Sequence, residues 1–171
     1  MRTLIATTLV LLPIGLAQPV AAGDDKNSPT DLPIRIDVPV QLEQANVVFN
    51  MNHFVMRGDM PVGLRYMDAL SKRLAEAGTK GQIIGVFYSQ AAHFTLTDKA
   101  YNAYRNVASG NPYKEVIANL IKQGVQLEEC AVSMENNHWT NDDLLPGVKV
   151  NTDAVRRLIQ LEQQGFVQIQ P

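Results

Sequence analysis

Short apolar runs alternate with longer amphipathic segments along most of this chain. The apolar runs cover 45–50, 82–88, 125–130, 148–150 and 166–169, and each is short enough for a buried strand. Between them, apolar residues recur at helical spacing in 59–78, 98–107, 111–124 and 153–164. This alternation predicts a three-layer, doubly wound α/β domain with a mainly parallel sheet of about five strands.

The expected helices have start and stop signals. Asp59 followed by Pro61 predicts the start of the first helix, because proline is favoured at the first helical position after a capping residue. Thr97 can cap the second helix through its hydroxyl group. Glycines at helix ends are expected to stop three of the helices, and these are Gly78, Gly124 and Gly165.

Residues 1–22 have the pattern of an export signal. Arg2 is followed by an apolar stretch from 4 to 16, and the small residues 20–22 predict cleavage before Gly23. We therefore expect a soluble periplasmic or exported protein. The apolar stretch is shorter than the roughly 20 residues that span a bilayer, so no membrane attachment is expected after cleavage. An uncleaved membrane tether is the alternative.

The remaining chain suits a single domain. Residues 23–44 are polar and interrupted by prolines, which predicts an extended or flexible lead-in to a domain at 45–171. Within the lead-in, the alternating Ile34, Ile36 and Val38 could add an edge strand.

Composition and motifs exclude several classes of function. The 15 Lys and Arg residues nearly balance the 17 Asp and Glu residues and are scattered, which gives no electrostatic footprint for nucleic acid. The sequence has no Gly-x-Ser-x-Gly elbow, phosphate-binding loop, Cys-x-x-Cys pair or dinucleotide-binding glycine motif. We therefore predict no cofactor.

Cys130 is the only cysteine, and it ends the third predicted strand just before a segment that could open a helix. Most lone cysteines are inert core residues. A helix N-terminus, however, offers free N–H groups that favour a thiolate. Glu128 and Glu129 act in the opposite direction, because nearby carboxylates oppose a second negative charge. The residues alone leave the inert and the reactive interpretations open.

Ligands of open parallel sheets bind beyond the carboxyl ends of the strands. We expect polar residues at these ends to share one edge of the sheet with Cys130. They are Asn50, Asn52 and His53 after the first strand, Tyr88, Ser89 and His93 at the second, and His138 and Trp139 after the third.

Each of these residues has a functional and a structural interpretation. His53 or His93 could pair with the thiolate or supply a proton, although each could also be a loop histidine bonded to water. Asn52 and Ser89 could donate to an anion or stabilise turns. Trp139 could line a pocket, but we favour a packing role.

A soft-metal site is a second possibility. Met51, His53, Met56 and Met60 bring thioether and imidazole groups together, as copper carriers do. Their spacing matches no known metal template, so we predict no metal ligands.

Residues 45–169 resemble the DsrE/DsrF-like family of sulfur-relay proteins. The similarity lies in the first strand with its polar loop, in 145–150, in 158–169 and most specifically in 124–130. It implies that Cys130 carries sulfane sulfur as a persulfide, and that the subunits assemble into oligomers. The best-known members are cytoplasmic and serve sulfite reductase or tRNA thiolation, so an exported member would need other partners.

These observations lead to one hypothesis and its alternatives. We expect a periplasmic homo-oligomer in which a water-accessible Cys130, tuned by His53 and His93, takes sulfur from a small donor such as a polysulfide or thiosulfonate. An acceptor thiol or partner protein would then receive the sulfur, because one cysteine cannot form an internal disulfide. The alternatives are a copper-binding protein and a small-ligand binding module without catalysis.

Overall fold

A computed structural model describes residues 34–171, so the predicted export signal and most of the lead-in lie outside the described residues. The described residues divide between two units, residues 34–39 and residues 40–171. In the first unit, the described residues 34–39 are exposed and form no strand, so the edge strand predicted from Ile34, Ile36 and Val38 is absent. No helix between 34 and 171 combines the length and the hydrophobicity needed to cross a bilayer.

The second unit is built on a five-stranded sheet in which every pair of neighbouring strands is parallel. The strand order is β6-β5-β4-β1-β7. The predicted fold class is therefore confirmed. The strands are β1 (Gln44–Met51), β4 (Lys80–Phe87), β5 (Gln126–Cys130), β6 (Lys149–Asn151) and β7 (Val167–Ile169).

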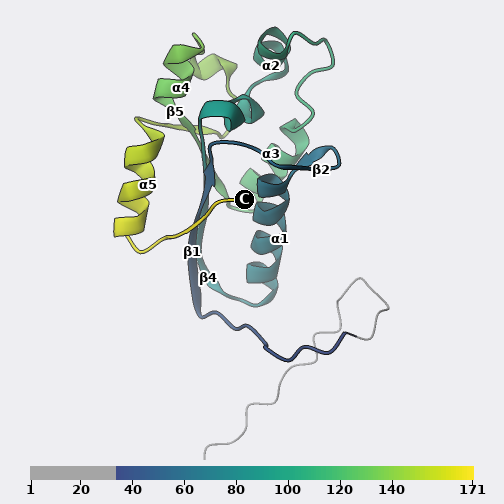
Figure 1. Ribbon diagram of the computed structural model, residues 1–171, viewed down its shortest axis with the longest axis vertical. Coiled ribbons are helices and arrows are strands. Elements are labelled where there is room, and N and C mark those ends of the chain that lie inside the picture. Colours follow the sequence, from purple (N-terminus) through teal and green to yellow (C-terminus); the bar gives the residue numbers. More distant parts are fainter. Residues whose placement is uncertain (1–33) are drawn as a thin grey trace, which may run out of the picture. The chain divides into compact units, whose positions relative to one another are not determined.

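Helices cover both faces of this sheet (Figure 1). One face packs against α5 (Ala154–Gln163), while the other packs against α1 (Val62–Glu76) and α3 (Lys114–Lys122). The shorter helical segments are α2 (Asp98–Arg105), α4 (Ala131–Asn136), η1 (Ser89–Thr95) and η2 (Asn141–Asp143).

The core forms two apolar clusters because side chains alternate between the two faces of each strand. The larger cluster lies on the α1 and α3 face and includes Phe49, Phe87 and Leu127. The smaller cluster lies under α5, and its members are Val48, Ile84, Val86, Cys130, Ala154, Leu158 and Leu161.

The helix signals were right at α2 and wrong at α1. Thr97 caps α2, because its side chain accepts a hydrogen bond from the backbone N–H of Ala100. By contrast, α1 begins at Val62, and no side chain caps it. Asp59 lies in a turn between the antiparallel strands β2 (Met56–Arg57) and β3 (Met60–Pro61), so the pairing of this hairpin delays the helix.

Candidate functional site

Cys130 ends β5 and lies under the first turn of α5. Its side chain is only 4% exposed and packs in the smaller apolar cluster. The Sγ atom accepts a hydrogen bond from the backbone N–H of Ala154 at 3.3 Å. The expectation of a water-accessible thiol is therefore wrong for this chain, because α5 closes over the sulfur.

The N–H group that reaches the sulfur comes from a distant part of the sequence. Asp153 caps α5 by accepting a hydrogen bond from the N–H of Arg156, and the first N–H groups of a helix have no partner within the helix. The N–H of Ala154 is therefore free to donate a hydrogen bond. Its acceptor is Cys130, which lies 24 residues earlier in the chain. The helix directly after Cys130, α4, also begins there as expected, but it makes no such bond to the sulfur.

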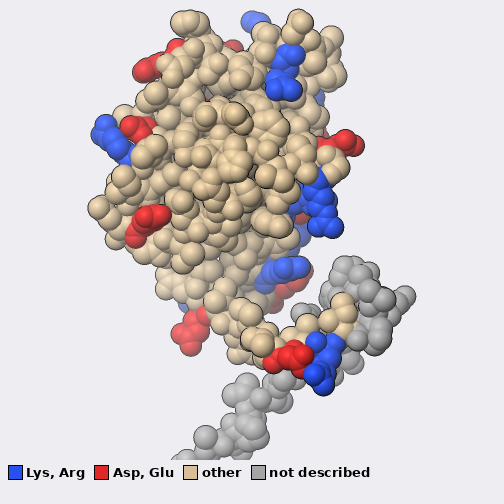
Figure 2. Space-filling model, in the orientation of Figure 1, with Lys and Arg blue, Asp and Glu red and all other residues tan. Residues whose placement is uncertain are grey.

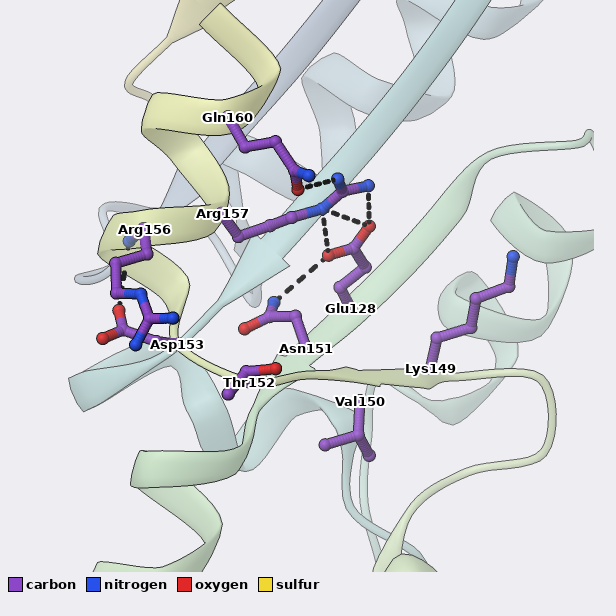
Figure 3. Close-up of a pocket in the computed structure, with 9 residues that line it drawn as sticks. All are labelled: Glu128, Lys149, Val150, Asn151, Thr152, Asp153, Arg156, Arg157 and Gln160. Atoms are coloured by element: carbon purple, nitrogen blue, oxygen red, sulfur yellow. Dashed lines mark hydrogen bonds and ion pairs between the residues drawn. The ribbon is translucent and has the colours of Figure 1, made fainter.

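Glu128 lies on the same face of the sheet as Cys130 and forms a buried ion pair with α5 (Figure 3). Arg157 Nε and Nη2 donate to both carboxylate oxygens at 2.9 to 3.2 Å. Gln126 and Asn151 donate to the same group. Burial alone would raise the pKa of Glu128, but the hydrogen bonds from Arg157 and Gln126 outweigh it and hold the pKa below its ordinary value.

A cavity of about 540 Å³ opens beside this ion pair. Asn151 forms part of its wall and pairs in register with Cys130, which places the two residues on neighbouring strands. Asn151 is 9% exposed, and its Oδ1 atom has no hydrogen-bond partner. The lining residues are Glu128, Lys149, Val150, Asn151, Thr152, Asp153, Arg156, Arg157 and Gln160.

Glu129 faces the opposite side of the sheet and is completely buried. Its Oε1 accepts a hydrogen bond from the N–H of Cys130 at 3.2 Å, and its Oε2 lies 2.7 Å from Thr95 Oγ1. Burial raises the pKa of this carboxyl well above its ordinary value and so favours its neutral form. Because the neutral form carries no charge, Glu129 opposes a thiolate less than the sequence suggests.

His93 is buried in an aromatic cluster and makes no bond to Cys130. Its Nδ1 lies 2.7 Å from the carbonyl oxygen of Gln90. Burial lowers the pKa of His93 to about 4, so the ring is neutral at pH 7 and cannot hold a thiolate by charge. The rings around it are those of Phe54, Phe94, Tyr101 and Tyr104. The predicted tuning of Cys130 by His93 is therefore wrong.

Within residues 34–171, no hydrogen bond joins the other two histidines to the sulfur. His53 is half-buried and contacts Asn52 Oδ1 and the side chain of Gln170. His138 is exposed in the turn after α4, where its φ is 57°. Trp139 is half-buried, packs against the larger core cluster and meets Tyr104 edge to face at 5.1 Å. That contact fits the packing interpretation of Trp139.

Of the remaining predicted residues, Asn50 and Tyr88 are on the side of the sheet that holds Cys130. Asn50 lies on the Cys130 face, because it pairs in register with Val86, and its buried Oδ1 has no hydrogen-bond partner. Tyr88 packs against the apolar cluster that contains Cys130. The N–H of Ser89 donates to Ser133 Oγ at 3.1 Å. The sequence reasoning missed Asn151, Ala154 and Arg157, because no local pattern shows which strand a later helix will cover.

The predicted soft-metal residues do not form one site. Met51 is 1% exposed and packs against Gly63 of α1, whereas Met56 is 40% exposed in the β2–β3 hairpin. From residue 34 onward, no three His, Cys, Asp or Glu side chains are grouped so that they could hold a metal ion.

A comparison with protein families identifies one that matches most of the described chain. The DsrE/DsrF-like family matches residues 66–171, from α1 to the end of the chain. The chain belongs to the DsrE/DsrF-like family. Membership in this family suggests a role related to sulfur relay, and residues 66–171 include Cys130 and all of α5.

Two solved structures share the fold of this DsrE/DsrF-like chain. MTH1491, a protein of unknown function from Methanobacterium thermoautotrophicum, is 22% identical with a TM-score of 0.58. The ychN protein from E. coli is 16% identical with a TM-score of 0.57. In both comparisons, 75% of this chain aligns with 100% of the other. No curated protein matches the sequence.

Proposed function

We propose that this protein is a periplasmic sulfur carrier in which Cys130 holds sulfane sulfur as a persulfide. The hydrogen bond from the N–H of Ala154 to Cys130 Sγ carries this proposal, because a donor at a helix N-terminus stabilises a thiolate. Membership in the DsrE/DsrF-like family supports it independently. The export pattern of residues 1–22 supports the location.

The transfer step is an exchange between a thiolate and a persulfide. The Cys130 thiolate attacks the outer sulfur of a donor R–S–S–H and forms a new S–S bond. The S–S bond of the donor breaks, its electron pair leaves with R–S⁻, and the proton stays on the transferred sulfur. Cys130 then passes this sulfur to an acceptor thiolate in the same way, so neither step needs an oxidant or a reductant.

The buried position of Cys130 sets a condition on this step. Only 4% of the residue is exposed, so the donor reaches the sulfur when the segment before α5 moves aside. Thr152 in this segment is exposed and Asp153 is half-buried, so the movement displaces few packed side chains. Burial also protects a bound persulfide from water and from unrelated thiols.

Assembly into homo-oligomers is part of the proposal. The face drawn in Figure 2 has its Lys, Arg, Asp and Glu side chains around the rim and none over the centre, where Figure 1 places the C-terminal end. The neighbouring β7 is an edge strand, and its Val167 is 64% exposed. An exposed apolar edge strand is suited to pairing with another chain.

Mass spectrometry of the intact protein after exposure to polysulfide tests the function. Wild-type protein should gain the mass of sulfur, lose it on reduction and pass it to an added thiol acceptor. The Cys130→Ser variant is the control and should gain nothing. An unmodified wild-type protein would instead favour a small-ligand binding module, in which a ligand raises the melting temperature of both proteins equally.

A further inference from the structure

The cavity beside Cys130 has one hydrogen-bonding atom that the fold leaves unused. Asn151 is nine-tenths buried, and its Nδ2 donates to Glu128 Oε2 at 3.2 Å. This bond fixes the orientation of the amide and leaves Oδ1 as an acceptor without a partner. Figure 3 shows this oxygen turned away from Glu128, in the wall of the cavity. A buried acceptor of this kind is available to a donor from a bound ligand.

The charged groups of the cavity favour an anion. Arg157 and Glu128 neutralise each other in their ion pair. The remaining charged lining residues are Lys149, Arg156 and Asp153, which leave one net positive charge. Arg156 is exposed, and among residues 34–171 no other side chain makes a hydrogen bond or ion pair with its guanidinium group. We therefore expect a ligand of this cavity to carry a negative charge for the basic side chains and a hydrogen-bond donor for Asn151 Oδ1.

The cavity also lies next to the sulfur. Asn151 is the register partner of Cys130, and neighbouring strands are about 4.8 Å apart. On the other side, Asp153 directly precedes Ala154, whose N–H holds Cys130 Sγ. The same short segment, 151–153, therefore lines the cavity and leads directly to the residue that contacts Cys130 Sγ.

We propose that this cavity binds an amino-acid or peptide thiol, with its carboxylate on Arg156 and an amide or ammonium N–H on Asn151 Oδ1. The inference rests on the proposed function, because it identifies R–S–S–H as the persulfide of such a thiol. Inorganic polysulfide and thiosulfate also carry negative charge. They have no N–H group, so they leave Asn151 Oδ1 without a donor.

Glutathione binding to the Cys130→Ser variant tests this inference without any covalent reaction. Calorimetric titration should give saturable binding of glutathione and weaker binding of thiosulfate. Arg156→Gln should weaken glutathione binding about tenfold, since a hydrogen bond to a charged group is lost. Asn151→Ala should weaken it to a similar degree. The control is Arg65→Gln, which changes an exposed arginine on α1 and should leave binding unchanged.

Three results would overturn the inference. They are the absence of saturable glutathione binding, thiosulfate binding as tight as that of glutathione, and glutathione binding that Arg156→Gln leaves intact. Arg156 is exposed, so its replacement keeps the fold even where Asn151→Ala disturbs Glu128. Sulfur loading of wild-type Cys130 from polysulfide is measured separately. Sulfur loading without glutathione binding would reject the proposed thiol site but keep the proposed carrier function. Glutathione binding without sulfur loading would reject the carrier function.

Discussion

Glu129 shows at the residue scale how a fold can keep a carboxyl group neutral. The Thr95 hydroxyl has one proton and lies 2.9 Å from the carbonyl oxygen of Ala92 and 2.7 Å from Glu129 Oε2. One proton cannot serve both acceptors at once, so when the hydroxyl donates to Ala92, a protonated Glu129 can donate to the hydroxyl. A protonated Glu129 satisfies every atom of this chain, in agreement with its raised pKa.

Replacing Glu129 with glutamine should change how stability depends on pH. Because the pKa of Glu129 is raised in the folded state, its contribution is full below its unfolded pKa and is lost as pH rises through the folded pKa. Above about pH 4.5, wild-type protein should lose up to about 1.4 kcal/mol per pH unit relative to Glu129→Gln. Urea unfolding at a series of pH values measures this difference.

Glu128→Gln is the matched control for that experiment. The pKa of Glu128 is lowered, so its contribution is present above its unfolded pKa and is lost as pH falls through the folded pKa. The pH dependence of the free energy of unfolding should therefore differ between Glu128→Gln and wild type in the opposite direction. Parallel pH curves for wild type and Glu129→Gln would show that Glu129 is ionised in the fold.

Replacing Ala154 with proline should slow the alkylation of Cys130 by iodoacetamide, because the thiolate loses a hydrogen-bond donor. Ala154 is the first residue of α5, a position where proline is favoured, and proline removes the N–H that donates to Sγ. Ala131→Pro makes the same change at the first residue of α4 and should have little effect. The rate of iodoacetamide alkylation at a fixed pH is measured for wild type and both variants. A slower reaction in Ala131→Pro alone would assign the stabilisation of the thiolate to α4.

At the element scale, the sequence predicts each strand and helix better than it predicts their partners. Hydrophobic periodicity locates the five strands, because burial requires apolar side chains at regular spacing. It cannot show that α5 covers Cys130, since that contact joins residues 24 positions apart. For the same reason, the sequence cannot show that η1 turns His93 away from the thiol. The ring lies in the aromatic cluster on the other face of the sheet.

The ion pair between Arg157 and Glu128 fastens α5 to β5, so its removal should loosen the cover over Cys130. Arg157→Gln leaves a buried carboxylate without its cation and should lower the free energy of unfolding by roughly 3 kcal/mol. Cys130 should then react faster with a bulky thiol reagent, because α5 opens more often. Chemical denaturation and a thiol-labelling time course measure the two effects.

Arg156→Gln serves as the comparison on the same helix turn, because Arg156 is exposed and has no part in the ion pair. Its stability and labelling rate should match those of wild type. Equal labelling rates in Arg157→Gln and wild type would show that the sulfur becomes accessible through some other movement.

For the 40–171 unit as a whole, the two edge strands are the places where the proposed assembly would attach another copy. β6 and β7 end the sheet on opposite sides, and Val150 and Val167 on these strands are partly exposed. Hydrophobic patterning predicts the number of strands, but an exposed valine and a buried one look alike in sequence. The fold class and the family could therefore be predicted, whereas the surfaces available for assembly could not.

Val167→Lys should reduce self-association, because a charge on an edge strand opposes pairing. Light scattering on the purified protein should give an assembly of several wild-type chains and a smaller species for the variant. Val107→Lys places the same charge at an exposed position after α2 and should leave the mass unchanged. A wild-type protein that scatters as a single chain would contradict the proposed assembly.

Trp139 gives the molecule an optical signal of its own. It is the only tryptophan in the chain and lies half-buried against Tyr104. Excitation of this indole selects one location, where α2 meets the segment after α4. A red shift of its emission then reports when this contact opens to water, without any dye or label.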